Sequence, residues 1–471
     1  MTTSDGESVS DRTRLLGRLH DSDYEACAKR EPPPDAGPSD ATGSSPSFSR
    51  EQKVLLACLC SGSLMGGCLV ALMIPFFPLE ARERGVSQTV TGAVFSCFAL
   101  TQLVVYPLTG RLVPRVGASR SYSLGLALAG VSTVAFGVLP MIGDTRAFIA
   151  ACFVTRVVEA VAISALNTAA LTVVANKFLE RTNTAVGITE TMTGVGISLG
   201  PAIGGGLYQL GGYGLPFYVL GVLMLTCAGL TALLMPSVCK PVRQTGRLWP
   251  MLRVLVGSAE VWLCCVMLLT VSMNWTAIDP SIEPYVFVAI GITPAQLGLY
   301  FLVATGAFTV FCAAWGRVHD SLHNTYALTT PCLVGAALGL LLLAPSPLLY
   351  GLHPSWWLLG VGLTVKEISQ GGTFIPLFNK IFKACLAGGL ENTVVTQSFV
   401  SSVFWTVFSV GNVVGPTAGG MIIDASSFPV MTTALAGWTL LVATASAIQA
   451  FRVYFESRSP RCSIAMPNRS E

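Results

Sequence analysis

The stretch Gly196-Ile-Ser-Leu-Gly-Pro-Ala-Ile-Gly-Gly205 returns later in the chain as Gly411-Asn-Val-Val-Gly-Pro-Thr-Ala-Gly-Gly420. Both copies fit the pattern GxxxGPxxGG, and both lie in apolar runs that are long enough to cross a bilayer as a helix. Glycines four residues apart let two helix backbones approach closely, and the proline bends the helix. Such a repeat in two apolar segments predicts a transporter fold built from two related halves.

The composition is that of a membrane protein. Of the 471 residues, 52% are hydrophobic and 11% are charged, whereas a soluble protein carries about 25% charged residues. We therefore expect an all-α membrane protein with twelve transmembrane helices, arranged as two bundles of six, because the apolar residues form twelve runs of roughly twenty residues. These runs are 54–77, 90–110, 121–142, 148–175, 184–210, 215–235, 259–287, 295–315, 325–344, 356–378, 394–423 and 431–451.

The positive charges predict the orientation. Most Lys and Arg residues between the runs lie in one set of alternate loops, and the opposite set holds only Arg82, Arg84 and Arg146. Because positive charge is retained in the cytosol, the basic loops and both termini are expected to be cytosolic. The predicted segments are a disordered tail (1–52), a first bundle (53–236), a basic linker (237–256), a second bundle (257–451) and a second tail (452–471).

The N-terminal tail contains Asp11-Arg-Thr-Arg-Leu15-Leu16. An acidic residue four positions before two leucines resembles the acidic dileucine signal, which clathrin adaptors read to direct proteins to endosomes and lysosomes. A tail of this composition cannot form a core, so the signal would be exposed. The alternative is a chance match of a short pattern.

Gly187 lies nine positions before Gly196, and with it the first copy of the repeat resembles the antiporter signature of the major facilitator superfamily. The matching residues are Gly187, Gly196, Gly200, Pro201, Gly204 and Gly205 in the first half, with Gly411, Gly415, Pro416, Gly419 and Gly420 in the second. The resemblance implies a 6+6 fold whose two bundles rock against each other. The alternative is that these residues serve helix packing alone.

A loop motif of the same superfamily, a glycine followed four residues later by an acid, is only half kept. Gly316 and Asp320 retain it before the ninth run, whereas Gly110 and Arg115 surround Pro114, which stands where the acid belongs before the third run. If that acid normally latches a closed state, the resemblance implies that gating in the first half relies on another contact.

Shorter stretches narrow the resemblance to the vesicular amine transporter family, and to its polyamine transporter type, over about residues 50–450. They are Ile74-Pro-Phe-Phe-Pro78, Arg156-Val-Val-Glu159, Glu190 and Asp279-Pro280. The resemblance implies proton-coupled exchange of an organic cation. Monoamine members carry an aspartate in the first helix, but run 54–77 contains no acid, which favours polyamines over monoamines as cargo.

Ionisable groups inside the spans are the candidate binding residues, because charges in a bilayer are costly and usually functional. Two of them are cations and five are anions: Arg156 and Lys366, against Glu159, Glu190, Asp279, Glu283 and Glu367. A cavity with surplus carboxylates attracts cations and repels anions. The surplus therefore favours a small cationic substrate.

Glu190 is the leading candidate for a site that binds a proton and an ammonium group in turn. It has no cation within one turn of its own helix, and it lies off the face of the glycine repeat. A carboxylate without a counter-ion in a low-dielectric site can hold either cation. The alternative is an ion pair between Glu190 and Lys366 across the two bundles.

The other charged residues allow more than one interpretation. Arg156 and Glu159 share a helix face, and they form either a static pair or a proton switch. Asp279 and Glu283 precede prolines that break the seventh helix, so they either bind a cation beside free carbonyls or lie in water at the helix end. The role of Lys366 and Glu367 is open, and Lys366 is expected to approach Glu190 or Glu159.

Aromatic residues are further candidates for binding residues, whereas the histidines are not. Cation–π contacts are available in principle from Phe76, Phe77, Tyr106, Trp405 and Trp438, although packing is the more frequent role of such residues. All four histidines, among them His319, are expected outside the spans. The sequence contains no phosphate-binding glycine loop, CxxC or HExxH pattern, so we expect no enzyme activity, metal, cofactor or nucleic-acid partner.

These features predict a proton-driven antiporter of organic cations, with polyamines as the favoured cargo, in a vesicular or endolysosomal membrane. The plasma membrane is the alternative location. The alternative functions are a facilitator or exporter of another organic cation, and a sensor or scaffold that kept the transporter fold. Neutralising the intramembrane acids would separate these classes, because a scaffold has no need of them.

Overall fold

The structure is a computed structural model. It describes residues 48–73, 77–86, 88–236, 248–278, 281–292, 294–322, 324–347 and 351–458. The chain divides into two units, Met1–Phe48 and Ser49–Glu471, and the helices described here all belong to the second. The expected sorting signal (Asp11, Leu15 and Leu16) and the acid Asp279 lie outside the described residues. Glu283 lies in a described helix, but its side chain is not described.

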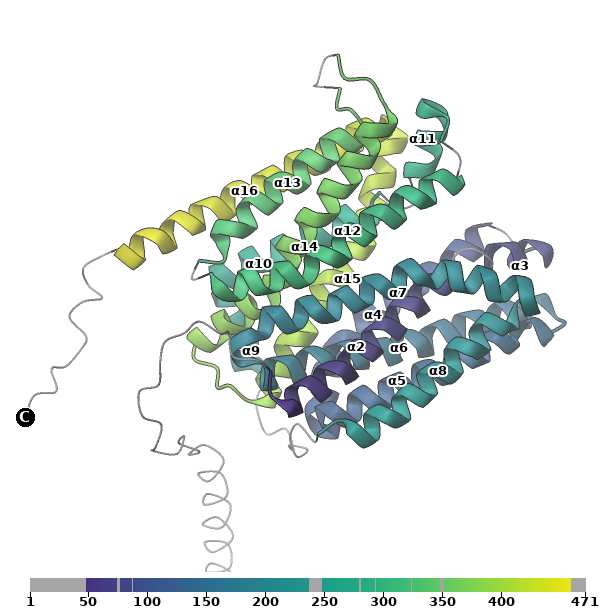
Figure 1. The fold of residues 1–471 in the computed structure, drawn as a ribbon, viewed down its shortest axis with the longest axis horizontal. Coiled ribbons are helices and arrows are strands. Elements are labelled where there is room, and N and C mark those ends of the chain that lie inside the picture. The colour runs from purple at the N-terminus through teal and green to yellow at the C-terminus, as the bar shows by residue number, and fades with distance from the viewer. Residues whose placement is uncertain are drawn as a thin grey trace, which may run out of the picture. The chain divides into compact units, whose positions relative to one another are not determined.

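The described residues contain helices and connecting segments but no strand, and the helices form two consecutive sets (Figure 1). The first set is α2 (Arg50–Leu72), α3 (Phe77–Glu83), α4 (Gln88–Val116), α5 (Ala118–Val138), α6 (Thr145–Lys177), α7 (Thr182–Gly211) and α8 (Gly214–Leu234), with short 3₁₀ turns at Leu139–Met141 and Leu179–Arg181. The second is α9 (Leu248–Gly257), α10 (Ala259–Thr276), α11 (Ile282–Ile290), α12 (Pro294–Ser321), α13 (Tyr326–Leu343), α14 (Trp356–Ala387), α15 (Val394–Ala425) and α16 (Phe428–Arg458).

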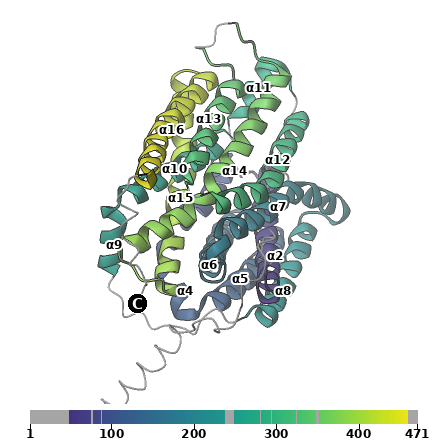
Figure 2. The same cartoon turned by 60° about the vertical axis from the view of Figure 1, so that its left-hand side comes forward.

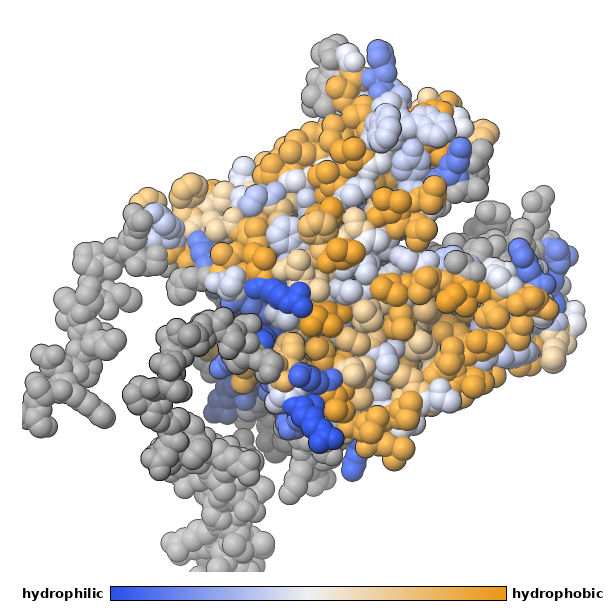
Figure 3. Space-filling model, in the orientation of Figure 1, coloured by the Kyte–Doolittle hydropathy of each residue, from blue (hydrophilic) through white to orange (hydrophobic). Residues whose placement is uncertain are grey.

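The predicted membrane character is confirmed. Ten helices within the described residues are long and apolar enough to span a membrane. Two more long helices, α7 and α14, match predicted runs, but α7 is rich in Gly and Thr and α14 contains Lys366 and Glu367. Side chains on the flank of both bundles are largely apolar in Figure 3, with hydrophilic residues nearer the ends. The number of twelve spans and the cytosolic termini stay predictions.

Several helices depart from the predicted boundaries. The run 259–287 is not one helix, because α10 ends at Thr276 and α11 begins at Ile282. The residues of the expected gating loops are helical in both halves, since α4 continues to Val116 and contains Gly110 and Arg115, and α12 continues to Ser321 and contains Gly316 and Asp320. Their role in gating stays a prediction. Hydropathy predicts such helix ends too early, because Arg and Lys lower the hydropathy although the backbone stays helical. The long apolar stems of these side chains can lie along the apolar surface. α16 likewise continues past residue 451 to Arg458.

The two glycine repeats pack in corresponding ways. In the first half, α7 lies against α2, and a Cβ atom added at Gly196 would lie 2.8 Å from the backbone nitrogen of Cys68. In the second half, α15 lies against α10, and a Cβ atom at Gly415 would lie 2.9 Å from the carbonyl oxygen of Met273. Glycine is therefore required at these contacts, because any side chain would push the paired helices apart.

The two bundles meet through α7 against α12 and α4 against α15. A Cβ atom at Gly187 would lie 3.4 Å from Gly316 Cα, so these two motif residues face each other across the interface. Figure 2 shows the same pairs from a second direction. The outer helices α5 and α8 pack together in the first bundle, and α13 and α16 pack together in the second. The space between the bundles is thus bordered by the remaining long helices.

Hydrogen bonds between the bundles gather where α6 and α12 end and where α7 and α15 begin. Thr172 donates to Ser398 over 3.2 Å, and Asn176 donates to Gln397 over 3.3 Å. Asp320 at the end of α12 accepts from the backbone of α7. The bundles are therefore joined by polar contacts at this end of the molecule.

Candidate functional site

A cavity of about 460 Å³ lies between the two bundles. Its lining comes from α2, α4, α6 and α7 of the first half and from α10, α12, α14 and α15 of the second. Small-molecule sites have volumes of roughly 300–1,000 Å³ and are mostly apolar with a few polar groups. The cavity therefore has the size and position of a substrate site shared by both halves.

Seven aromatic residues form much of the cavity wall. Tyr106 of α4 and Trp405 of α15 stack across the two bundles, with ring centroids 6.0 Å apart. Trp275 of α10 makes edge contacts with Phe308 and Phe408, at 5.7 Å and 6.0 Å. Faces of such rings attract cations. The full set is Phe98, Tyr106, Trp275, Phe308, Phe374, Trp405 and Phe408.

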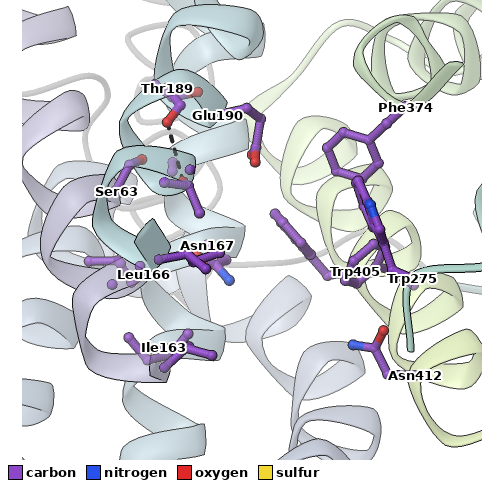
Figure 4. A pocket seen from close by; sticks show the side chains of 18 of the residues that line it. Ser63, Ile163, Leu166, Asn167, Thr189, Glu190, Trp275, Phe374, Trp405 and Asn412 are labelled. Atoms are coloured by element: carbon purple, nitrogen blue, oxygen red, sulfur yellow. Dashed lines mark hydrogen bonds between the residues drawn. The ribbon is translucent and has the colours of Figure 1, made fainter. Parts of the chain in front are cut away.

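Glu190 and Glu367 are the acidic residues among the described residues that line the cavity, and that lining contains no Lys, Arg or His. Glu190 projects from α7 of the first half, and Glu367 belongs to α14 of the second. Polar groups without formal charge, including Asn167 and Asn412, also line the cavity (Figure 4). The electrostatic character of the lining is therefore negative.

Glu190 points into the cavity from α7, as Figure 4 shows. It forms no hydrogen bond or ion pair with any residue that the structure describes. The hydroxyl of the adjacent Thr189 donates to the carbonyl oxygen of Val186 at 2.8 Å rather than to Glu190. Glu190 is thus a half-buried carboxylate without a counter-ion in the described part of the chain, and the alternative pair with Lys366 is not formed.

Glu367 is in a different state, because both of its oxygens are occupied. Oε1 lies 2.7 Å from Nζ of Lys366, and Oε2 accepts a hydrogen bond of 2.8 Å from the indole N–H of Trp275. The expectation that Lys366 approaches Glu190 or Glu159 is therefore wrong. Its flexible four-carbon stem folds back onto the next residue, and the ammonium group is buried beside Glu367.

Arg156 and Glu159 form a buried ion pair behind the cavity wall. The guanidinium carbon of Arg156 lies 4.7 Å from the ring centroid of Phe98, and that ring lines the cavity. About two turns beyond Glu159 along α6, Asn167 reaches the cavity and donates to the Tyr106 hydroxyl at 3.1 Å. The ring of Phe98 thus lies between the Arg156 guanidinium and the cavity, and the use of the pair as a proton switch stays a prediction.

Asp320 of the retained loop motif joins the two halves. Its carboxylate accepts from the backbone N–H groups of Asn183 at 3.2 Å and Thr184 at 2.7 Å, and from the Thr184 hydroxyl at 2.6 Å. These N–H groups belong to the first turn of α7, where helix N–H groups lack partners and negative charge is favourable. Asp320 of the second half therefore caps a helix of the first half.

Other predicted residues lie elsewhere. The expectation for His319 is wrong, because this residue lies within α12, is buried and has Nε2 2.7 Å from the carbonyl oxygen of Gly372. Phe77 and Trp438 are not part of the cavity lining. Phe77 packs with Phe136, and the indole N–H of Trp438 donates to Thr270. Phe76 lies outside the described residues.

The sequence interpretation missed most of the aromatic wall. Trp275, Phe374 and Phe408 were not among the candidates, although Trp405, Phe408 and Asn412 are spaced three and four residues apart, as one face of a helix requires. That spacing is the signal that could have found them. It does not reveal which face of α15 meets the cavity, because the opposite faces are also apolar.

Comparison with known proteins agrees with this architecture. The sequence profile described as Major Facilitator Superfamily matches residues 59–390. The MFS-type transporter SLC18B1 of Rattus norvegicus is 31% identical over 88% of this chain and 90% of its own length. The synaptic vesicular amine transporter of Bos taurus is 25% identical over 76% of this chain and 65% of its own.

Solved structures share the fold at lower identity. The crystal structure of the human organic anion transporter MFSD10 superposes with a TM-score of 0.67 at 14% identity, over 85% of this chain and 100% of the other. That of the transporter FucP gives the same TM-score and identity, over 85% and 99%. The chain therefore belongs to the major facilitator superfamily as an integral, multi-pass transporter, similar to SLC18B1 and related to the vesicular amine transporters.

Proposed function

We propose that the protein is a proton-coupled antiporter that exchanges protons for organic cations, with polyamines as the favoured cargo. The observation that carries the proposal is Glu190, a carboxylate without a described counter-ion in an aromatic cavity between the two bundles. Arg156–Glu159, behind Phe98, would act as the proton switch. No cofactor takes part, since the proton gradient supplies the energy.

The mechanism is competition for one carboxylate. Glu190 binds either a proton or an ammonium group, because two cations cannot share it at full strength in a low-dielectric site. When the bundles rock, the site faces one side of the membrane and then the other. One pH unit provides about 1.4 kcal/mol per exchanged proton, enough for roughly tenfold accumulation.

The positions of the acids support polyamines rather than monoamines as the cargo. The part of α2 that borders the cavity has no acid, whereas acids stand on α7 and α14, in opposite halves. A cargo with separated ammonium groups could bind Glu190 with one group and compete with Lys366 for Glu367 with another. The name of a relative, the synaptic vesicular amine transporter, supports an amine as the chemical class.

The test is uptake of radiolabelled spermidine into proteoliposomes that contain the purified protein, with an acidic interior and a protonophore control. Wild-type protein is expected to accumulate spermidine only while the gradient lasts. Glu190→Gln should abolish gradient-driven uptake while the protein stays folded, because the amide cannot take up a proton. Glu391→Gln, at an exposed residue outside the cavity lining, is the matched control and should transport normally.

Other outcomes point to the alternative functions. Uptake that does not depend on the pH gradient would identify a facilitator. Accumulation of a different organic cation, with none of spermidine, would identify another cargo for the same fold. Amine binding without transport in a folded preparation would favour a sensor or scaffold. Gradient-driven uptake retained by Glu190→Gln would contradict the role assigned to this residue.

The proposed location is an acidic vesicle or lysosome-related organelle, reached through a clathrin adaptor that reads Asp11, Leu15 and Leu16. Replacing both leucines by alanine should move the protein to the cell surface, because the adaptor then loses its apolar contact. Microscopy of the tagged full-length chain measures this. An unchanged organelle pattern for Leu15→Ala/Leu16→Ala would contradict the sorting proposal and leave the transport proposal untouched.

A further inference from the structure

The two carboxylates of the cavity differ in what they can offer to a cargo. Glu190 has no described partner, whereas Glu367 is bound by Lys366 at 2.7 Å and by the Trp275 indole at 2.8 Å. Glu367 nevertheless lines the cavity, and Lys366 does not. The ammonium group of Lys366 is therefore a positive charge of the protein itself that lies next to the second acidic residue of the cavity, Glu367.

Lys366 is held in this position by helix packing. Its side chain is 1% exposed, and α13 passes so close that a Cβ atom at Gly339 would lie 2.8 Å from the Cβ atom of Lys366. The base of the side chain is thus packed closely against α13. A buried ammonium group needs a paired carboxylate, and Glu367 is the one that it contacts.

We propose that Lys366 is a tethered counter-cation that determines how much a cargo gains from a second positive charge. With Lys366 on Glu367, the cavity presents one carboxylate, Glu190, without a counter-ion. A second ammonium group must compete with Lys366 for Glu367. Lys366 thereby limits the preference for polyamines over monoamines, which makes it a specificity-determining residue although it does not line the cavity.

This inference rests on the proposed organic-cation site, so the experiment first establishes amine binding by wild-type protein. Pentylamine and cadaverine share a five-carbon chain and differ by one ammonium group. Their affinities are measured by competition with labelled spermidine on the purified protein, and the readout is the ratio of the two affinities. A ratio removes effects that weaken both amines alike, such as a general loss of packing.

Lys366→Met is expected to raise the preference for cadaverine by about tenfold, because a charge-assisted hydrogen bond to Glu367 becomes available to the cargo. Lys366→Gln is the second variant, since its amide can still donate to Glu367 and keeps that carboxylate hydrogen-bonded if Met impairs folding. Adding Glu367→Gln to either variant should remove the gain, because the acceptor of the second ammonium group is then lost.

The matched control is Lys380→Met. Lys380 belongs to the same helix as Lys366, α14, and pairs with Glu260 of α10 at 3.2 Å, and neither Lys380 nor Glu260 lines the cavity. This substitution also removes one lysine from an ion pair, but it should leave the cadaverine-to-pentylamine ratio unchanged. An increase there equal to that of Lys366→Met would show a general charge effect and overturn the proposal.

A failure of the proposed function and a failure of the role of Lys366 would give different results. Wild-type protein that is folded and binds neither amine would overturn the proposed function, and this inference with it. Wild-type binding, with a ratio that stays constant in both Lys366→Met and Lys366→Gln, would overturn the inference alone and make Lys366 a packing residue. A ratio that rises in these variants and falls back with Glu367→Gln is the result expected.

Discussion

At the scale of single residues, neighbours decide what a carboxylate does. Glu190 and Glu367 line one cavity, yet only Glu367 has a cation and an indole N–H beside it. Asp320, a third acid, lies outside the cavity and binds the first turn of α7. The same functional group thus occurs without a described partner, as half of an ion pair and as a helix cap.

Asp320→Ala is expected to loosen the two bundles at the end where α7 begins. The substitution removes the acceptor of the Asn183 and Thr184 N–H groups, which then need another partner. Spin labels at Arg120 and Leu322, two exposed residues of opposite halves near this end, measure the separation by pulsed electron resonance in a cysteine-depleted background. Longer and broader distances are expected.

Asp144→Ala is the control for this measurement. Asp144 caps α6 through the Ala147 N–H at 2.8 Å, entirely within the first half. Its loss should cost about 1 kcal/mol of stability without changing the distance between the labels. Equal distance changes in both variants would contradict a specific role of Asp320 in holding the bundles together.

At the scale of residues, the sequence predicted the candidate binding residues better than it predicted their interaction partners. The cost of a charge in a bilayer was enough to select Glu190, Arg156 and Glu159 as candidates. The predicted partner of Lys366 was wrong. Helix geometry places adjacent residues on different faces, but it does not describe how far a flexible side chain can fold back. The aromatic wall was missed because apolar helices contain aromatic residues on every face.

At the scale of helices, glycines set how closely neighbours approach. Gly196 and Gly415 lie at equivalent contacts, α7 with α2 and α15 with α10. Gly205 and Gly420 belong to the same repeats, but a Cβ atom there would have no neighbour within 4 Å. One motif therefore combines positions that require glycine for packing with positions that do not.

Gly196→Ala should destabilise the protein, whereas Gly205→Ala should not. The added methyl group at Gly196 would lie 2.8 Å from the Cys68 nitrogen and 3.0 Å from Gly67 Cα, and such overpacking costs about 1–3 kcal/mol. Thermal unfolding of both variants in the same detergent tests this difference. Equal melting temperatures would mean that α2 and α7 can move apart without cost.

Helix positions could be predicted well from apolar runs, and helix ends less well. The prolines predicted a break in the seventh helix, but they did not predict where α10 ends and α11 begins. The extension of α4 to Val116 was missed because Arg111 and Arg115 reduce hydropathy without interrupting a helix. Hydropathy reports contact with lipid, whereas a helix also continues beyond the lipid.

At the scale of the whole molecule, the repeated halves create one shared site. The cavity takes its lining from four helices of each half, while polar contacts such as Thr172 with Ser398 join the halves at one end. A movement of one bundle against the other would therefore change access to the cavity without dismantling either bundle. The internal repeat predicted this division, but the pairing of charges between helices depends on side-chain packing that a repeat does not specify.

The central claim is that a proton and a cargo ammonium group compete for Glu190. The most direct measurement is the number of protons released when spermidine binds to the purified protein in weakly buffered solution, at several values from mildly acidic to mildly alkaline pH. Wild-type protein is expected to release protons on binding at the pH values where Glu190 is protonated, and Glu190→Gln to release none. Spermidine binding without proton release at every pH, or equal release by Glu190→Gln, would contradict the account.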